Sequence, residues 1–321
     1  MTAARSAVEQ TLADVGEFGL IDLVRTSADA PHVLIGPGDD AALVRASPQG
    51  MLASIDVAVE GRHFRRDWSS ARDVGHKVAA ANLADIAAMG GTARSLLVGF
   101  SAPGDLPVPW AMELIEGLVI EAASVGAVVV GGDVTSADSI VVSVSVLGEP
   151  GDHVVRRNGA RPGDVVAVAG RLGWAGAGFA VLTRGFRSPR AVVDAHRRPQ
   201  PPYSAGPQAA AAGAHAMVDV SDGLLADLGH IARGSGVRLD LRSDAVEVPE
   251  PLRAAGAALG VNPLGFVLTG GDDHALAACF IADAVPDGWL QIGVAHEPDD
   301  AAAVTVDGEE WPGAPGHSHF G

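Results

Sequence analysis

Residues 217–232 read MVDVSDGLLADLGHIA and join a short apolar run, an acidic turn and a helical segment. The run Met217–Val220 is typical of a buried strand, and Gly223 marks the point near which a helix begins. Asp219 and Asp222 lie on the strand and in the turn. Because strands alternate with helices along the rest of the chain, the sequence predicts an α/β or α+β fold.

The recurring feature of the chain is an aspartate at the end of an apolar strand, next to glycine or serine. Asp and Gly are common in turns, and Asp222 could simply cap the helix near Gly223. Adjacent pairs such as Asp39 and Asp40 are harder to explain in this way, since one carboxylate is enough to cap a helix. The pattern favours a shared divalent-metal site at strand ends, where glycine amides can also approach phosphates. The acidic stretches are GPGDD (36–40), SIDVAVEG (54–61), VGGDVTS (130–136), MVDVSDG (217–223), LTGGDD (268–273) and, inside a helix, NLADIAAMG (82–90).

Composition and charge limit the class of protein. The chain has 321 residues, of which 48% are hydrophobic and 4% aromatic, which suits α/β layers. Its formal net charge is −17 and Lys77 is the sole lysine, so no basic face for nucleic acid is expected. Cys279 is the single cysteine, which excludes an intrachain disulfide and a cysteine cluster for zinc. Without a signal peptide or a membrane span, a cytoplasmic protein with no membrane partner is predicted.

A change of composition near residue 150 predicts two domains, 1–150 and 151–321. Ser70 and Asp73 are placed to form a capping box at the start of a helix. The predicted helices cover 6–28, 69–91, 111–124 and 174–183. The predicted strands cover 41–46, 51–57, 96–101, 127–130, 140–147, 165–169 and 217–220, with strand and turn regions at 269–278 and 304–309. Residues 131–139 are predicted as the loop between two strands, and 184–208 as a long surface connection.

Several familiar motifs of nucleotide and acyl chemistry are absent. A P-loop would need GxxxxGK[ST], but Lys77 lies in VGHKVAAAN without that glycine spacing. There is no VAIK or HRD motif of protein kinases and no GxSxG of hydrolases. GWAGAG (173–178) does not fit GxGxxG and is more typical of a closely packed helix.

The acidic and glycine motifs together resemble the thiamine-phosphate kinase family, in the superfamily of aminoimidazole ribonucleotide synthetase. The resemblance covers nearly the whole chain. The matching pieces, in family order, are GEF (16–18), GPGDDAALV (36–44), SIDVAVEGRHF (54–64), NLADIAAMG (82–90), VGGDVT (130–135), RNGARPGD (157–164), DVSDGLLADLGHIA (219–232), LTGGDDHAL (268–276) and GHSHF (316–320).

The resemblance implies an enzyme with a two-domain fold. Its N-terminal domain would bind ATP and magnesium, with a sheet that forms a barrel across a homodimer, and its C-terminal α/β domain would complete the active site. The implied reaction is the ATP-dependent phosphorylation of thiamine monophosphate to thiamine diphosphate. Direct phosphoryl transfer needs positioning and charge neutralisation, so no covalent catalytic residue is expected.

The resemblance also implies roles for single residues. The implied magnesium ligands are Asp40, Ser54, Ile55, Asp56, Asp85, Asp133, Asp219 and Asp222. The implied ATP contacts are Gly132, Arg157 and Ser221, and the implied substrate contacts are His63, Asp272 and His317. The role of Asp39 is not decided by the sequence: it could support the metal ligands without binding the metal, or it could form the turn.

Four positions depart from the family pattern. Ile55 stands where threonine is common, so a metal contact there could use only the backbone. Asp272 replaces a glutamate, His274 a tyrosine and His317 an aromatic residue, which affects the substrate pocket most.

Two alternatives remain at this point. Aminoimidazole ribonucleotide synthetase has similar acidic and glycine loops, and a nucleotide- or metal-binding protein without turnover would need the same ligands. Selenophosphate synthetase would need a cysteine and a lysine near the N-terminus, and the hydrogenase maturation relative needs a C-terminal cysteine. This chain has none of these residues.

Overall fold

The computed structural model describes residues 10–24, 29–37, 41–299, 301 and 303–317. The chain divides into two compact units: Met1–Ile86 with Ala93–Glu149, and Ala87–Thr92 with Pro150–Gly321. Each is a mixture of helices and strands, as the sequence predicts. In the described part of the chain, no helix combines the length and the apolar character needed to cross a membrane.

The first unit is built on a four-stranded sheet in the order β3-β6-β4-β5. β3 and β6 are antiparallel, and β4 and β5 are parallel. Its elements are α1 (Leu12–Val24), β1 (Val33–Ile35), β2 (Leu43–Val44), β3 (Leu52–Val59), α2 (Ala71–Ala88, which ends in the second unit), β4 (Thr92–Ala102), α3 (Val108–Ser124), β5 (Val128–Ser136) and β6 (Val141–Glu149).

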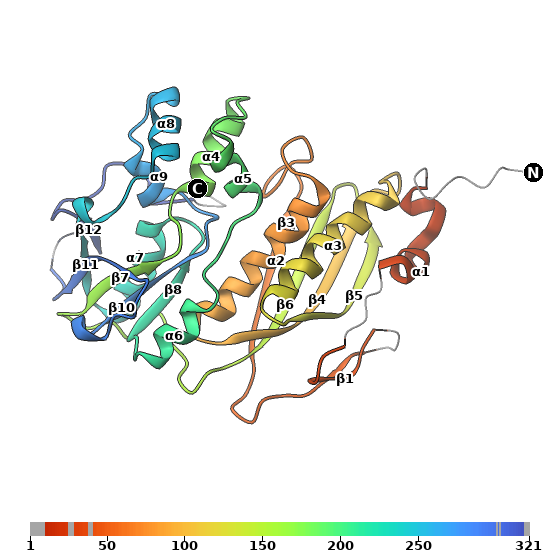
Figure 1. Cartoon of the computed structure of the whole chain (residues 1–321), viewed down its shortest axis with the longest axis horizontal. Helices are drawn as coiled ribbons and strands as arrows, with labels where there is room; N and C mark the ends of the chain where they lie inside the picture. The colour runs from red at the N-terminus through yellow and green to blue at the C-terminus, as the bar shows by residue number, and fades with distance from the viewer. Residues whose placement is uncertain (1–9, 25–28, 38–40, 300, 302, 318–321) are drawn as a thin grey trace, which may run out of the picture. The chain divides into compact units, whose positions relative to one another are not determined.

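Helices α2 and α3 pack closely against each other over this sheet (Figure 1). A Cβ at Gly75 would lie 1.9 Å from the carbonyl oxygen of Leu114, so only glycine permits this approach of the two helices. At the start of α2, Ser70 Oγ accepts the N–H of Asp73, whose carboxylate accepts the N–H of Ser70. This confirms the predicted capping box.

The two faces of the first sheet differ in burial. Alternate valines of β6, including Val144 and Val146, are fully buried. On β3 and β4, Ile55, Val57 and Leu97 remain 61%, 48% and 39% exposed. Since side chains alternate between the faces of a strand, one face of this sheet is packed and the other presents apolar side chains to the surface.

The second unit is built on a six-stranded sheet in the order β12-β9-β11-β7-β10-β8. Only β12 and β9 pair in parallel. Its elements are β7 (Val165–Ala169), α4 (Trp174–Thr183), α5 (Arg190–Arg197), α6 (Ala205–Ala211), β8 (Ala216–Val220), α7 (Leu224–Ser235), β9 (Arg238–Leu241), η1 (Ser243–Ala245), α8 (Glu250–Leu259), α9 (Leu264–Thr269), β10 (Ala275–Phe280), η2 (Ala282–Ala284), β11 (Leu290–His296) and β12 (Val304–Val306).

Both faces of β10, and of β8 at the edge of the sheet, are buried. Leu276 and Phe280 of β10 belong to a core cluster with Ala209 of α6 and Met217 of β8. The acidic motifs of this unit lie at the ends of these two strands, with Asp219 near the end of β8 and Asp272 and Asp273 just before β10.

Two sequence predictions about connecting segments are wrong. Residues 184–208 are not a surface connection, because they contain α5 and the start of α6. The proline- and arginine-rich flanks hide a buried helical face that includes Val192 and Val193. Gly132 and Asp133 do not lie in a loop between strands, because β5 continues to Ser136.

Candidate active site

The acidic set of the first unit begins on β3, where Ser54 and Asp56 are half-buried and Ile55 is exposed. Ser54 pairs in register with Val146 and Asp56 with Val144, and both valines are fully buried. Ser54 and Asp56 therefore share the packed face of the sheet, and the side chain of Ile55 points to the other. The side chain of Ile55 therefore points away from the face that carries Ser54 and Asp56.

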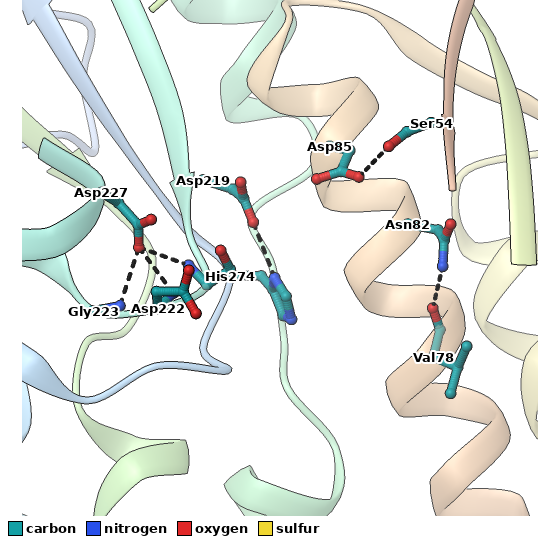
Figure 2. A network of polar contacts seen from close by, with 10 residues as sticks. Ser54, Val78, Asn82, Asp85, Asp219, Asp222, Gly223, Asp227 and His274 are labelled. Carbon is teal, nitrogen blue, oxygen red and sulfur yellow. Dashed lines mark hydrogen bonds and ion pairs between the residues drawn. The ribbon is translucent and has the colours of Figure 1, made fainter. Parts of the chain in front are cut away.

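Helix α2 brings a second carboxylate to the same face. The hydroxyl of Ser54 donates to Asp85 Oδ2 at 2.5 Å (Figure 2). Asn82, one turn earlier on α2, is fully buried and donates from Nδ2 to the carbonyl of Val78 at 2.9 Å. Ser54 and Asp85, which are far apart in sequence, are thus brought together as the resemblance implies.

His63 lies just after β3, and the N–H of Val59 donates to its Nδ1 at 3.0 Å. A nitrogen that accepts a hydrogen bond carries no proton, so in the neutral imidazole the proton lies on Nε2. The geometry holds His63 as a hydrogen-bond donor of fixed orientation.

Gly132 and Asp133 lie on β5, in register with Val98 and Gly99 of β4, and both are exposed. A Cβ at Gly132 would lie 2.1 Å from the carbonyl oxygen of Val98. Gly132 is therefore needed for the approach of two backbones, in addition to any contact with a ligand.

In the second unit, Asp219 is the buried carboxylate at the end of β8. Its Oδ2 lies 3.0 Å from Nδ1 of His274, and both side chains are almost fully buried (Figure 2). His274, where the family commonly has a tyrosine, therefore orients one oxygen of a predicted metal ligand.

The backbone of the turn after Asp219 is held by the buried carboxylate of Asp227, which the sequence did not point to. The N–H groups of Ser221, Asp222 and Gly223 all donate to Oδ2 of Asp227, each at 3.0 Å. The alternative in which Asp222 caps α7 is wrong, because Gly223 is the N-cap and no side-chain cap is made there. Burial raises the pKa of Asp227 to about 7, and the charge of Asp219 adds to this effect against the amide hydrogen bonds.

The pair Asp272 and Asp273 is divided by the fold. Asp272 has a φ of 66° and donates its N–H to the carbonyl of Ser221 at 2.8 Å, with its side chain half-buried. Asp273 points inward, and its Oδ1 accepts the N–H of Ala175 in the first turn of α4 at 2.9 Å. Burial raises the pKa of Asp273 to about 7, opposed by hydrogen bonds from the amides of Ala175 and Gly173.

Arg157 and His317 are the remaining predicted contacts of the second unit, and both are exposed. The backbone carbonyl of Arg157 accepts the hydroxyl of Ser235 at 3.3 Å. Burial lowers the pKa of His230, and the positive charge of Arg157 lowers it further. The N–H of His317 donates to the carbonyl of Asp222 at 2.9 Å, which ties the C-terminal segment to the acidic turn.

Asp39 and Asp40 lie outside the described residues. Among the residues that are described, no three His, Cys, Asp or Glu side chains gather closely enough to hold a metal ion alone. Magnesium typically takes only one or two carboxylates, with substrate phosphates and waters as its other ligands. The hard oxygen donors of Ser54 and Asp85 in the first unit, and of Asp219 in the second, are each of the type that magnesium prefers.

Two family models match the chain, "AIR synthase related protein, N-terminal domain" over residues 38–149 and "AIR synthase related protein, C-terminal domain" over residues 161–301. A thiamine-monophosphate kinase of Mycobacterium tuberculosis is 49% identical over 314 residues, which are 97% of this chain and 93% of the relative. The thiamine-monophosphate kinase of Corynebacterium glutamicum is 37% identical, over 92% of this chain and 91% of its own.

Solved structures give the same result. Thiamine-monophosphate kinase from Stenotrophomonas maltophilia matches with a TM-score of 0.80 and 31% identity, over 90% of this chain and 96% of that one. AaThiL complexed with AMPPCP and TMP matches with a TM-score of 0.78 and 30% identity, over the full length of both chains.

Proposed function

This chain belongs to the AIR synthase related family and, within it, to the thiamine-monophosphate kinases, and from this premise we infer the reaction it catalyses. It transfers the γ-phosphoryl group of ATP to thiamine monophosphate, giving ADP and thiamine diphosphate. The observation that carries this function is the 49% identity to a thiamine-monophosphate kinase over 97% of the chain.

The residue roles that follow are a proposal, which rests on the family motifs and, for the described residues, on the geometry given above. Asp56, Asp85, Asp133, Asp219 and Asp222, with Asp40 and the Ser54 hydroxyl, would hold magnesium ions. Bound magnesium would neutralise the negative charge that builds up on the transferring phosphoryl group. The Ser54–Asp85 hydrogen bond at 2.5 Å orients two of these side chains, and the contact with His274 at 3.0 Å orients Asp219.

The remaining predicted residues would position the two substrates. Arg157 offers an exposed guanidinium to the nucleotide phosphates, and Gly132 and Ser221 lie on tightly packed backbone. His63 would donate from Nε2 to the acceptor phosphate of thiamine monophosphate. Asp272, which the turn at Ser221 holds by its N–H, and His317 would contact the thiamine moiety.

We also propose that the chain forms a homodimer through the first sheet, which presents the apolar side chains of Ile55, Val57 and Leu97 to the surface. Large exposed apolar patches of this kind mark interaction surfaces. A cytoplasmic location stays a prediction, consistent with a reaction that consumes ATP.

The function is tested by ADP release with thiamine monophosphate, ATP and Mg²⁺. Replacing the half-buried Asp56 with Asn should lower kcat by at least about 100-fold, because it removes a metal-ligand charge. Asp105→Asn, at an exposed aspartate of the same unit, is the matched control and should keep wild-type turnover. If the wild-type chain binds AMPPCP but forms no ADP, the assigned reaction is wrong. Equal activity of the two variants would contradict the role of Asp56 alone.

A further inference from the structure

Three successive backbone N–H groups in the second unit converge on a single carboxylate oxygen. Ser221, Asp222 and Gly223 each donate to Oδ2 of Asp227 at 3.0 Å. Figure 2 labels Asp222, Gly223 and Asp227. Asp227 lies in the first turn of α7 and is only 2% exposed. It donates its own N–H to the carbonyl of Gly223 at 2.9 Å, as part of the helix.

A concave run of successive amides at the start of a helix is a common binding site for phosphate in proteins. In this chain an internal carboxylate fills that position. The three amides, which carry partial positive charge, are therefore neutralised by the protein itself and have no donor left for a nucleotide.

The carbonyl groups of the same turn are also taken by the protein. The N–H of Asp272 donates to the carbonyl of Ser221 at 2.8 Å, and that of His317 to the carbonyl of Asp222 at 2.9 Å. A Cβ at Gly271 would lie 2.2 Å from the Ser221 carbonyl oxygen, so the neighbouring loop is in close contact. Because the amides and carbonyls of the turn already have partners within the protein, the side chains of Ser221 and Asp222 are the groups best placed to reach a ligand.

We propose that Asp227 is a positioning residue for phosphoryl transfer, which occupies the amide cradle of residues 221–223 and so presents the side chains of Ser221 and Asp222 as the ligand-binding groups of the turn. The inference rests on the proposed function for the identity of the ligands, a nucleotide phosphate with its divalent cation. A role limited to capping α7 would stabilise the helix but would not affect metal or nucleotide binding.

The test compares Asp227→Ala and Asp227→Asn with Asp164→Asn. Asp164 is a matched control because it is 4% exposed, accepts the backbone N–H of Arg161 at 2.7 Å, and contacts His215 rather than the turn. The measurements are amide hydrogen exchange at 221–223 without ligand, and calorimetric binding of AMPPCP as a function of Mg²⁺ concentration. Neither measurement requires turnover. If the proposed reaction is wrong, the kinase assay fails; if the positioning role is wrong, the Asp227 variants bind AMPPCP like wild type.

In Asp227→Ala we expect faster amide exchange at residues 221–223. The Mg²⁺ concentration needed for half-maximal AMPPCP binding should rise about 10- to 100-fold. Asp227→Asn keeps an acceptor oxygen but not the charge, so its amide exchange and its Mg²⁺ dependence should lie between those of wild type and Asp227→Ala. If the alanine variant does not fold, the asparagine variant serves as the test. Added formate should bind the three amides of residues 221–223 in Asp227→Ala and bring the Mg²⁺ concentration needed for AMPPCP binding partly back to that of wild type. The proposal is overturned if the Asp227 variants bind AMPPCP and Mg²⁺ like wild type, or no worse than Asp164→Asn does.

Discussion

Replacing Asp273 with Asn should change how the stability of the protein depends on pH. Asp273 is 5% exposed, and its Oδ1 accepts the N–H of Ala175 at 2.9 Å. Burial raises its pKa from the ordinary 3.8 to about 7. The asparagine variant keeps an acceptor for Ala175 but cannot ionise, so it isolates the effect of the charge.

The sign and size of the effect follow from linkage. Because the folded state holds the Asp273 proton more tightly than the unfolded state, the free energy of unfolding falls as pH rises from 3.8 to about 7 and is constant above. A shift of this size corresponds to about 4 kcal/mol over the whole window, of which about 2 kcal/mol is lost between about pH 5.5 and about pH 8. Because asparagine does not ionise, Asp273→Asn lacks this contribution to the dependence of the free energy of unfolding on pH.

The assay is urea unfolding followed by circular dichroism without Mg²⁺, at about pH 5.5 and about pH 8. Wild type should lose about 2 kcal/mol more than Asp273→Asn between these conditions. Asp227, whose pKa burial also raises, contributes equally to both proteins and cancels in the difference. Asp105→Asn, at an exposed residue, should follow wild type. Parallel pH curves for wild type and Asp273→Asn would refute the reasoning.

Three further predictions concern single contacts. Gly223→Ala should cost at least about 2 kcal/mol in thermal unfolding, because φ is +129° and a Cβ would lie 2.7 Å from a carbonyl oxygen, whereas Gly213→Ala (φ +79°, open space) should cost about 1 kcal/mol. His274→Phe should weaken Mg²⁺-dependent AMPPCP binding about 10- to 100-fold, because it removes the partner of Asp219, while His274→Gln, which keeps a donor, should lose less; equal binding in calorimetry would contradict this. Ile55→Asp should convert the proposed dimer to a monomer in light scattering; an unchanged mass would reject that interface.

Local signals in the sequence were sufficient for much of the fold. The capping box of Ser70 and Asp73 forms as predicted because both residues belong to one helix start. The GWAGAG segment is a closely packed helix, since a Cβ at Gly178 would lie 2.1 Å from the carbonyl oxygen of Val192. The helix α5 was missed because it is short and lies between prolines and arginines, although its buried residues Val192, Val193 and His196 recur at helical spacing.

The site was predictable where residue type alone limits the chemistry, and less so where tertiary contacts decide. Oxygen donors at Ser54 and Asp85 could be proposed from their motifs, and the structure shows that they meet. Asp227 gave no comparable signal, because an acidic residue in the first turn of a helix is common and is usually exposed. Its spacing from Gly223, one helical turn, is the only hint that the sequence holds.

The acidic motifs contain two kinds of carboxylate, and the fold separates them by which hydrogen bonds they accept. Asp227 and Asp273 are buried, and one oxygen of each accepts backbone N–H groups of the protein: Oδ2 of Asp227 and Oδ1 of Asp273. Their sequence neighbours Asp222 and Asp272 remain half-buried and keep side chains that can reach a ligand. Neutralising an interior carboxylate should therefore change stability or loop order in the absence of ligand, whereas neutralising Asp222 should act only when Mg²⁺ and nucleotide are present. In the second unit the interior carboxylates thus support backbone instead of binding a ligand: Asp227 holds the turn from which Asp222 would bind, and Asp273 holds the first turn of α4 beside Asp272.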